Sequence, residues 1–175
     1  MDYLEKARDV LETEIAGMQR VKNDLDGGFR QAVDAILETI DHGGKVVVAG
    51  VGKNLHIGNK IAATLTSTGT PAVVMHPIEA MHGDFGILDD RDILLAMSYS
   101  GASDELLALL QPVKRKGVRI IAMTGEMDSP LAHHSDIIVS VKVDKEACPF
   151  NMAPTASTTA TLALGDALAM VCLLY

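Results

Sequence analysis

The sequence predicts a three-layer α/β fold built on a five-stranded parallel sheet of the doubly wound, flavodoxin-like type. After residue 45, short apolar runs alternate with helix-patterned segments, and this alternation is typical of βαβ units on a parallel sheet. The chain has 175 residues, of which 48% are hydrophobic, so it can fill one sizeable core. Two independent domains are not expected.

The residues before the predicted sheet have a helical pattern. Apolar side chains spaced three, four or seven apart mark one helical face in residues 1–25 and another in residues 32–40, with Gly27 and Gly28 between them. We expect an N-terminal helical hairpin over residues 1–42, packed on the same domain as residues 43–175. The alternative is that the two helices supply a face for dimerisation.

Five strands and five further helices are predicted in the remainder of the chain. The strands are Val46–Ala49, Ala72–Met75, Ile93–Met97, Val118–Met123 and Ile137–Val141. The helices are Leu55–Ser67, Ile78–Met81, Ser103–Lys116, Pro130–His133 and a last one from Ala156 onward. The apolar run that ends this last helix is shorter than the ~20 residues that cross a bilayer, so we expect a core helix and no membrane contact.

Composition and charge exclude several classes of protein. Lys and Arg number 15 against 23 Asp and Glu, and aromatic residues are 3%, so neither a basic surface nor stacking platforms for nucleic acid are expected. The two cysteines, Cys148 and Cys172, form no CxxC pair, and the charged start of the chain does not resemble a secretory signal. A cytoplasmic protein is the simplest expectation.

The loop after the first strand, residues 50–54, is the first candidate for a binding site. In a parallel sheet, ligands bind beyond the carboxyl ends of the strands. The loop resembles part of the Walker A and Rossmann glycine motifs but completes neither, so no nucleotide cofactor is predicted. It still offers backbone N–H groups near Gly52 and Asn54, together with Lys53, to an anion at a helix start. A simple tight turn is the alternative.

Hydroxyl side chains cluster at two predicted helix starts. Ser98, Ser100 and Ser103 surround a glycine after the third strand, and a second set, Thr155, Ser157, Thr158 and Thr159, opens the last helix. Hydroxyls at a helix N-terminus can donate to phosphate oxygens, and the helix dipole favours the anion. The alternative is that Ser103 is only an N-cap.

A histidine-rich segment follows the second strand. His76, Glu79 and His82 are spaced three apart and could converge on a metal, but Pro77 disfavours a helix at His76, and no second ligand cluster appears. No metal is therefore predicted. His82 fits better as an acid/base group, because the ordinary pKa of histidine lies near neutrality.

Ordered motifs from residue 47 to residue 173 resemble the sugar isomerase (SIS) domain, and closely the D-arabinose 5-phosphate isomerases. The matching segments are Gly50-Val51-Gly52-Lys53, His56-Ile57-Gly58, residues 67–71, residues 76–84, Ser98-Tyr99-Ser100-Gly101, residues 145–149, residues 153–161 and residues 165–169. The resemblance covers nearly three quarters of the chain. It includes the SIS domain only and not the pair of CBS modules that many relatives append.

The resemblance implies a reaction and assigns residues to it. The reaction is interconversion of D-ribulose 5-phosphate and D-arabinose 5-phosphate, with Lys53, His82, Glu105 and Glu146 as the catalytic residues. Phosphate and substrate contacts would come from Gly52, Asn54, Ser98, Ser100, Ser103, Ser157, Thr158 and Thr159. Asn54 stands where serine is usual. The family pattern also continues past residue 175 into a His-Pro-Gly-Gly segment with a further catalytic histidine, so we expect a longer natural chain.

Aldose–ketose isomerisation through an enediolate needs positioned acids and bases and no cofactor. We expect Glu146, with Glu105 as the other candidate, to be a base whose pKa is raised by shielding from water. Lys53 would neutralise the oxyanion, and His82 would open the ring or shuttle protons. Two alternatives remain open: a sugar-phosphate-binding module without turnover, and an isomerase of another phosphosugar such as a hexulose phosphate. A homo-oligomer is expected, and the resemblance implies a tetramer.

Overall fold

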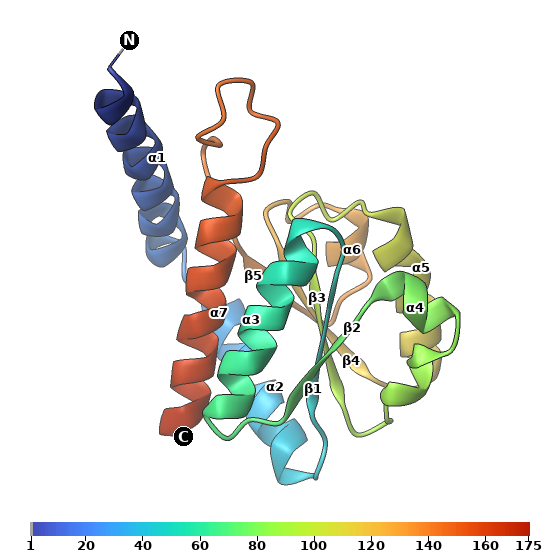
Figure 1. Ribbon diagram of the computed structural model, residues 1–175. Coiled ribbons are helices and arrows are strands. Elements are labelled where there is room, and N and C mark those ends of the chain that lie inside the picture. The colour runs from blue at the N-terminus through green and yellow to red at the C-terminus, as the bar shows by residue number, and fades with distance from the viewer. Residues whose placement is uncertain (1) are drawn as a thin grey trace.

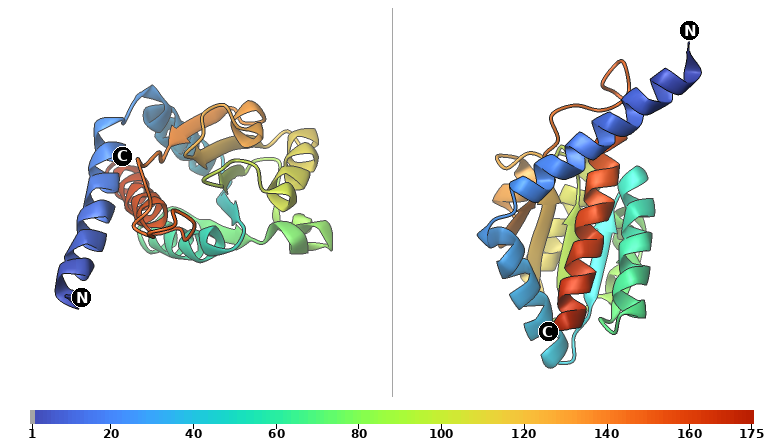
Figure 2. Two further views of the ribbon diagram at one scale, coloured as in Figure 1. Left: turned by 90° about the horizontal axis from the view of Figure 1, so that it is seen from above. Right: turned by 90° about the vertical axis from the view of Figure 1, so that its left-hand side faces the viewer.

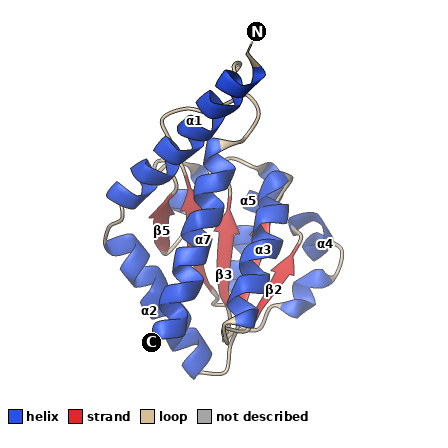
Figure 3. Cartoon of the chain, turned by 60° about the vertical axis from the view of Figure 1, so that its left-hand side comes forward, coloured by secondary structure: helices blue, strands red, loops and turns tan. Residues whose placement is uncertain are grey.

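The computed structural model describes residues 2–175 and confirms the three-layer α/β fold with a five-stranded parallel sheet (Figure 1). The strands are β1 (Val46–Gly50), β2 (Ala72–Met75), β3 (Ile93–Met97), β4 (Arg119–Thr124) and β5 (Ile137–Ser140), in the spatial order β2-β1-β3-β4-β5. Because every neighbouring pair is parallel, the five carboxyl ends meet at one edge of the sheet, the upper edge in Figure 3. Loops that bear function are expected at this edge.

Seven helices and one short 3₁₀ turn surround the sheet in the described part of the chain. They are α1 (Tyr3–Asn23), α2 (Gly27–Asp41), α3 (Lys53–Ser67), α4 (Pro77–Met81), η1 (Asp84–Ile87), α5 (Asp104–Arg115), α6 (Pro130–His133) and α7 (Ala156–Leu174). The predicted elements are all present with small shifts at their ends. The 3₁₀ turn was not predicted, since its four residues are too few to show a periodicity.

The sheet lies between two helical layers (Figure 2). Successive side chains of a strand belong to the cores on opposite faces of the sheet. Val46 and Val48 of β1 pack toward α2, α3 and α7, whereas Val47 and Ala49 pack toward α4, α5 and α6. Each strand of β1, β3 and β4 is therefore buried on both faces, and this explains why these strands are continuous apolar runs rather than alternating ones.

The two N-terminal helices pack on the rest of the domain. The carboxylate of Asp2 accepts hydrogen bonds from the backbone of Leu4 and Glu5 at the start of α1, and Asp26 caps α2 in the same way through Gly28. Helix α1 contacts α7, while α2 contacts β5 and α7, so their main partners are these elements rather than each other. The first turns of α1 extend beyond the body of the domain (Figure 1).

Helix α7 is the one described helix whose length and composition would suit a membrane span. In the fold it lies between α1 and α3 and buries a face of small and aliphatic residues that includes Ala160, Leu164 and Leu168. Gly165 allows α3 to approach closely, because any Cβ there would collide with the side chain of Ile61. The predicted role of α7 as a core helix agrees with this packing.

Candidate functional site

The loop between β1 and α3 presents Lys53 at the carboxyl edge. Gly52 adopts a positive φ of 58°, a conformation that glycine tolerates, and no side chain caps the start of α3. Lys53 is the first residue of the helix and is exposed, and no ion pair involves it among residues 2–175. Its ammonium group is therefore available to an anion, and the half-buried Asn54 follows it.

The three predicted serines lie together in the loop between β3 and α5. The Oγ atoms of Ser98 and Ser103 are 3.0 Å apart, and the backbone N–H of Gly101 donates to Ser98 Oγ at 3.1 Å. Ser103 occupies the N-cap position of α5, but its hydroxyl makes no capping hydrogen bond. Ser103 is thus an N-cap by position but not through its side chain, and the amide groups of the first turn carry no side-chain cap.

Two close contacts hold this serine loop in place. Gly101 has a φ of 62°, and a Cβ at this position would collide with Ser129 in the loop before α6. The ring of Tyr99 covers Gly125, and its hydroxyl donates to the carbonyl of Val143 and accepts from the N–H of the same residue, both at 3.2 Å. Sequence reasoning missed Tyr99 as a site residue, although it stands between two predicted phosphate ligands.

Glu146, in the segment between β5 and α7, caps the last helix. One carboxylate oxygen, Oε2, accepts from the N–H of Thr155 at 2.8 Å, from the hydroxyl of Thr155 at 3.0 Å and from the N–H of Ser157 at 3.2 Å. The backbone N–H of Glu146 donates in turn to the side chain of Asn151 at 2.8 Å. Glu146 is half-buried, in contrast with the exposed Glu105 in the first turn of α5.

These hydrogen bonds correct the expectation for the protonation state of Glu146. Burial raises the pKa of its carboxyl group and is the largest single influence, but the hydrogen bonds from Ser157 and Thr155 together outweigh it. The pKa of Glu146 therefore lies below its ordinary value, not above it. Burial does act on this carboxyl group in the expected direction, but the sequence could not reveal that the same segment surrounds the carboxylate with donors.

The hydroxyls at the start of α7 already have partners within the protein. Thr158 donates to the carbonyl of Thr155 at 2.9 Å, and Thr159 donates to Glu14 of α1 at 2.9 Å. Ser157 is buried beside Glu146, which occupies the amide end of the helix. Phosphate contacts by Ser157, Thr158 and Thr159 stay predictions, and the geometry favours Ser98, Ser100 and Ser103 for that role.

The histidine segment follows β2 at the same edge. His82 is the C-cap residue of α4 and is exposed, with its backbone N–H donating to the carbonyl of Glu79 at 2.9 Å. His76 uses its ring nitrogen Nδ1 to cap the same helix, accepting from the N–H of Ile78 at 3.2 Å. Among residues 2–175 no group of three His, Cys, Asp or Glu residues has the arrangement of a metal site.

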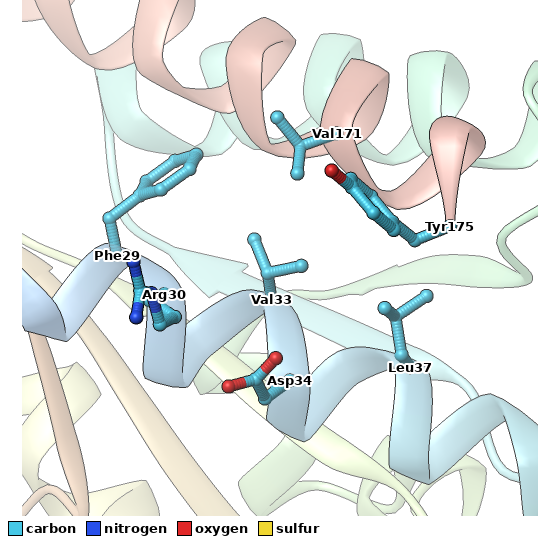
Figure 4. A pocket seen from close by; sticks show the side chains of 7 residues that line it. All are labelled: Phe29, Arg30, Val33, Asp34, Leu37, Val171 and Tyr175. Carbon is cyan, nitrogen blue, oxygen red and sulfur yellow. The ribbon is translucent and has the colours of Figure 1, made fainter.

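A cavity of about 220 Å³ lies beside Glu146 at the carboxyl edge, and its lining includes Tyr99, Glu146 and Ser157. A more apolar cavity of about 370 Å³ lies between α2 and the end of α7, where Phe29, Val33 and Val171 face one another (Figure 4). This second cavity contains none of the predicted site residues. The smaller cavity is therefore the better candidate for polar chemistry.

The structure brings some predicted site residues into contact and leaves others on separate loops. Ser98 meets Ser103, and Glu146 meets Ser157. Lys53, His82 and Glu105 follow β1, β2 and β3, so all three lie at the carboxyl edge, and all three are exposed. Their assignment to one active centre remains a prediction.

At the carboxyl edge, the first turns of α3 and α5 lack side-chain caps, and the same edge carries the serine loop and an exposed lysine. This combination is typical of a phosphate-binding α/β domain. Within that class, the chain belongs to the SIS domain family, whose model matches residues 40–171. The family resemblance drawn from the motifs is thereby confirmed.

Curated relatives match nearly the whole chain. Arabinose 5-phosphate isomerase KdsD of Francisella tularensis is 47% identical over 171 residues, which are 98% of this chain and 52% of that protein. Arabinose 5-phosphate isomerase GutQ of Escherichia coli K12 is 46% identical over 95% of this chain and 51% of its own length. The chain thus spans about half the length of the curated relatives it matches.

Solved structures of similar length share the fold. The protein c3406 of E. coli CFT073, in complex with arabinose 5-phosphate, superimposes with a TM-score of 0.94 at 33% identity over 99% of this chain and 93% of its own. A sugar-phosphate isomerase described as putative from Listeria monocytogenes gives a TM-score of 0.94 at 34% identity, covering 100% of this chain and 92% of its own.

Proposed function

We propose that this chain is an aldose–ketose isomerase that interconverts D-ribulose 5-phosphate and D-arabinose 5-phosphate through an enediolate. The observation that carries the proposal is the 47% identity over 98% of this chain to a protein named arabinose 5-phosphate isomerase. A neighbour at 33% identity in complex with arabinose 5-phosphate supports the same substrate class. The residues at the carboxyl edge supply the chemistry that such a reaction needs.

The phosphate end of the substrate fits the serine loop. Ser98, Ser100 and Ser103 offer three hydroxyls at the start of α5, whose first-turn amides have no side-chain cap. An anion at this position gains from both the N–H groups and the helix dipole, typically about 0.3–1 kcal/mol from the dipole alone at exposed sites. Lys53 at the start of α3 adds a positive charge.

The proton moves between C1 and C2, which are the carbonyl carbon and the adjacent hydroxyl-bearing carbon. In the aldose-to-ketose direction a carboxylate removes the proton from C2, negative charge develops on the oxygens, and a proton returns at C1. Glu146 suits the base because its lowered pKa keeps it ionised at neutral pH. Lys53 would stabilise the developing charge, and His82 would exchange protons with the sugar oxygens or open the ring.

We also propose that the protein works in the cytoplasm as a homo-oligomer. The two cysteines are unpaired, as expected for a reducing compartment. Lys53, His82 and Glu105 are exposed in a single chain, and a neighbouring subunit would shield them from water. The tetrameric state follows from the family resemblance.

The test is turnover of arabinose 5-phosphate and of hexulose phosphates in separate reactions, followed by NMR of the product sugars. We expect ribulose 5-phosphate from arabinose 5-phosphate and slower or no turnover of the hexulose phosphates. The variant Lys53→Met should lower kcat about 10²–10³-fold, because it removes charge stabilisation of the transition state. Binding of arabinose 5-phosphate without turnover would instead identify a sugar-phosphate-binding module.

A further inference from the structure

The hydroxyl group of Thr155 makes two hydrogen bonds that close the segment around Glu146. It accepts from the N–H of Ala147 at 2.8 Å and donates to Glu146 Oε2 at 3.0 Å. A hydroxyl has one hydrogen to donate, and an ionised carboxylate can only accept. The hydrogen bond therefore runs from Thr155 to Glu146, while the N–H of Ala147 holds the hydroxyl oxygen from its acceptor side.

Thr155 stands at the N-cap of α7 but does not cap the helix with its own side chain. A threonine at this position ordinarily accepts from an amide of the first turn. Here the carboxylate of Glu146 takes that place by accepting from the N–H of Ser157, and the threonine hydroxyl is used to hold the carboxylate. The carboxylate of Glu146, rather than the hydroxyl of Thr155, therefore caps α7, and the hydroxyl orients the carboxylate.

Only one oxygen of Glu146 is engaged in this way. The three hydrogen bonds from Thr155 and from the N–H of Ser157 all end on Oε2, and none of them ends on Oε1. Glu146 lines the cavity of about 220 Å³ together with Tyr99 and Ser157. The arrangement leaves one oxygen for a substrate proton while the other is held against α7.

We propose that Thr155 is a positioning residue for Glu146, holding Oε2 so that the ionised carboxylate presents Oε1 to the substrate. The proposal rests on the proposed isomerase function, because it assigns Glu146 to the reacting site. Groups that fix a reacting side chain in this manner typically change rates by about 10–100-fold when removed, by analogy with the outer partners of metal ligands. Thr155 itself need not touch the sugar.

Other charged groups also surround Glu146, so a variant that tests the role of Thr155 must leave them unchanged. Lys6 and Asp9 of α1 form an ion pair at 2.8 Å and line an adjoining cavity that Glu146 shares. The charged and titratable neighbours are Lys6, Asp9, Tyr99, Asp144, Lys145 and Cys148. A substitution at Thr155 leaves all of them unchanged.

The experiment compares Thr155→Val with Thr155→Ser. Valine keeps the shape of threonine and removes both hydrogen bonds of the hydroxyl, whereas serine keeps them. Two quantities are measured in each variant: the pKa of Glu146 by ¹³C NMR of its carboxyl carbon, and the pH dependence of kcat and KM for arabinose 5-phosphate. Thr64→Val is the matched control, since Thr64 on α3 donates only to the carbonyl of Lys60 in its own helix.

We expect Thr155→Val to raise the pKa of Glu146 and to move the acidic limb of the kcat profile to higher pH. At the pH optimum kcat should fall about 10–100-fold with a smaller change in KM. Thr155→Ser should restore the pKa and bring kcat within about threefold of the parent. Thr64→Val should leave the pKa and both kinetic constants unchanged.

Two results would overturn the proposal. One is an unchanged pKa of Glu146 in folded Thr155→Val, and the other is a loss of kcat that Thr155→Ser does not restore. If the parent protein binds arabinose 5-phosphate but shows no turnover, the proposed isomerase function fails. The NMR measurement then still decides whether Thr155 holds the carboxylate in its ionised form, so the two failures are distinguishable.

Discussion

At the scale of single residues, Glu146 shows how position decides the chemistry of a side chain. Its sequence neighbours mark it as a candidate site residue but say nothing of its hydrogen bonds, and the expectation of a raised pKa came from burial alone. In the structure the donors of Thr155 and Ser157 converge on one carboxylate oxygen and lower the pKa. Because Glu146 caps a helix and also lines a cavity, we expect it to contribute to stability as well as to the candidate site.

This double role predicts a pH-dependent effect of Glu146→Gln on stability. A carboxyl group whose pKa is lowered by folding stabilises the protein above its ordinary pKa, and that contribution disappears as the pH falls through the lowered value. We expect the variant to reduce the free energy of unfolding by about 1 kcal/mol at pH 7. The difference should vanish at acidic pH, as measured by urea unfolding.

Glu12→Gln provides the control for this measurement. Glu12 is exposed on α1, and none of the ion pairs or side-chain hydrogen bonds of the described residues involves it. Its substitution should change stability by less than about 0.5 kcal/mol at any pH. An equal effect of both substitutions at pH 7 would contradict the capping role of Glu146.

At the scale of elements, the serine loop depends on the conformation of one glycine. Gly101 combines a φ of 62° with a space in which a Cβ would collide with Ser129. The sequence shows a glycine between serines but not the neighbour that excludes a side chain, because Ser129 comes from a different loop. The geometry of the loop thus depends on packing between segments that are distant in the chain.

We expect Gly101→Ala to lower the free energy of unfolding by about 1–3 kcal/mol. It should also weaken the binding of arabinose 5-phosphate, because the serine hydroxyls must move to make space. Thermal unfolding and calorimetric titration check the two effects. Gly27→Ala, at the start of α2 with no atom near the added methyl group, should be neutral or slightly stabilising. Equal effects of the two substitutions would exclude this explanation.

The difference between local sequence patterns and contacts between distant segments explains how much of the fold and of the candidate site could be predicted. The core strands were found with shifts of about one residue because β1, β3 and β4 are continuous buried runs. The serines after β3 and Lys53 after β1 follow from the rule that ligands bind at the carboxyl edge. The contacts of Tyr99 with Val143 and of Thr155 with Glu146, and the lowered pKa of Glu146, could not be predicted, because they depend on contacts between residues that are separated in the sequence.

At the scale of the whole molecule, a single chain leaves apolar side chains and predicted site residues exposed. Leu4, Leu11 and Ile15 of α1 are 67%, 59% and 58% exposed, and the first turns of α1 extend beyond the domain (Figure 1). Lys53, His82 and Glu105 are exposed at the carboxyl edge. Assembly of several copies would bury the apolar face of α1 and shield the site from water.

We therefore expect a molar mass in solution that is a multiple of 18.6 kDa, measured by light scattering after size exclusion. Leu11→Glu and Ile15→Glu should reduce this mass and the activity together, because a buried unpaired charge opposes association. Lys22→Glu, which changes charge on the same helix without removing an apolar group, serves as the control. A parent protein that is monomeric at high concentration would contradict the expectation.

Incubation of the chain with D-ribulose 5-phosphate in heavy water, followed by ¹H and ²H NMR, tests directly whether it isomerises a pentose phosphate through an enediolate. An enediolate formed between C1 and C2 takes its proton back from a group that exchanges with solvent, so D-arabinose 5-phosphate should appear with deuterium at C2. Lys53→Met should slow both the formation of the aldose and the incorporation of deuterium. Absence of aldose, together with absence of deuterium from the recovered sugar, would contradict the account.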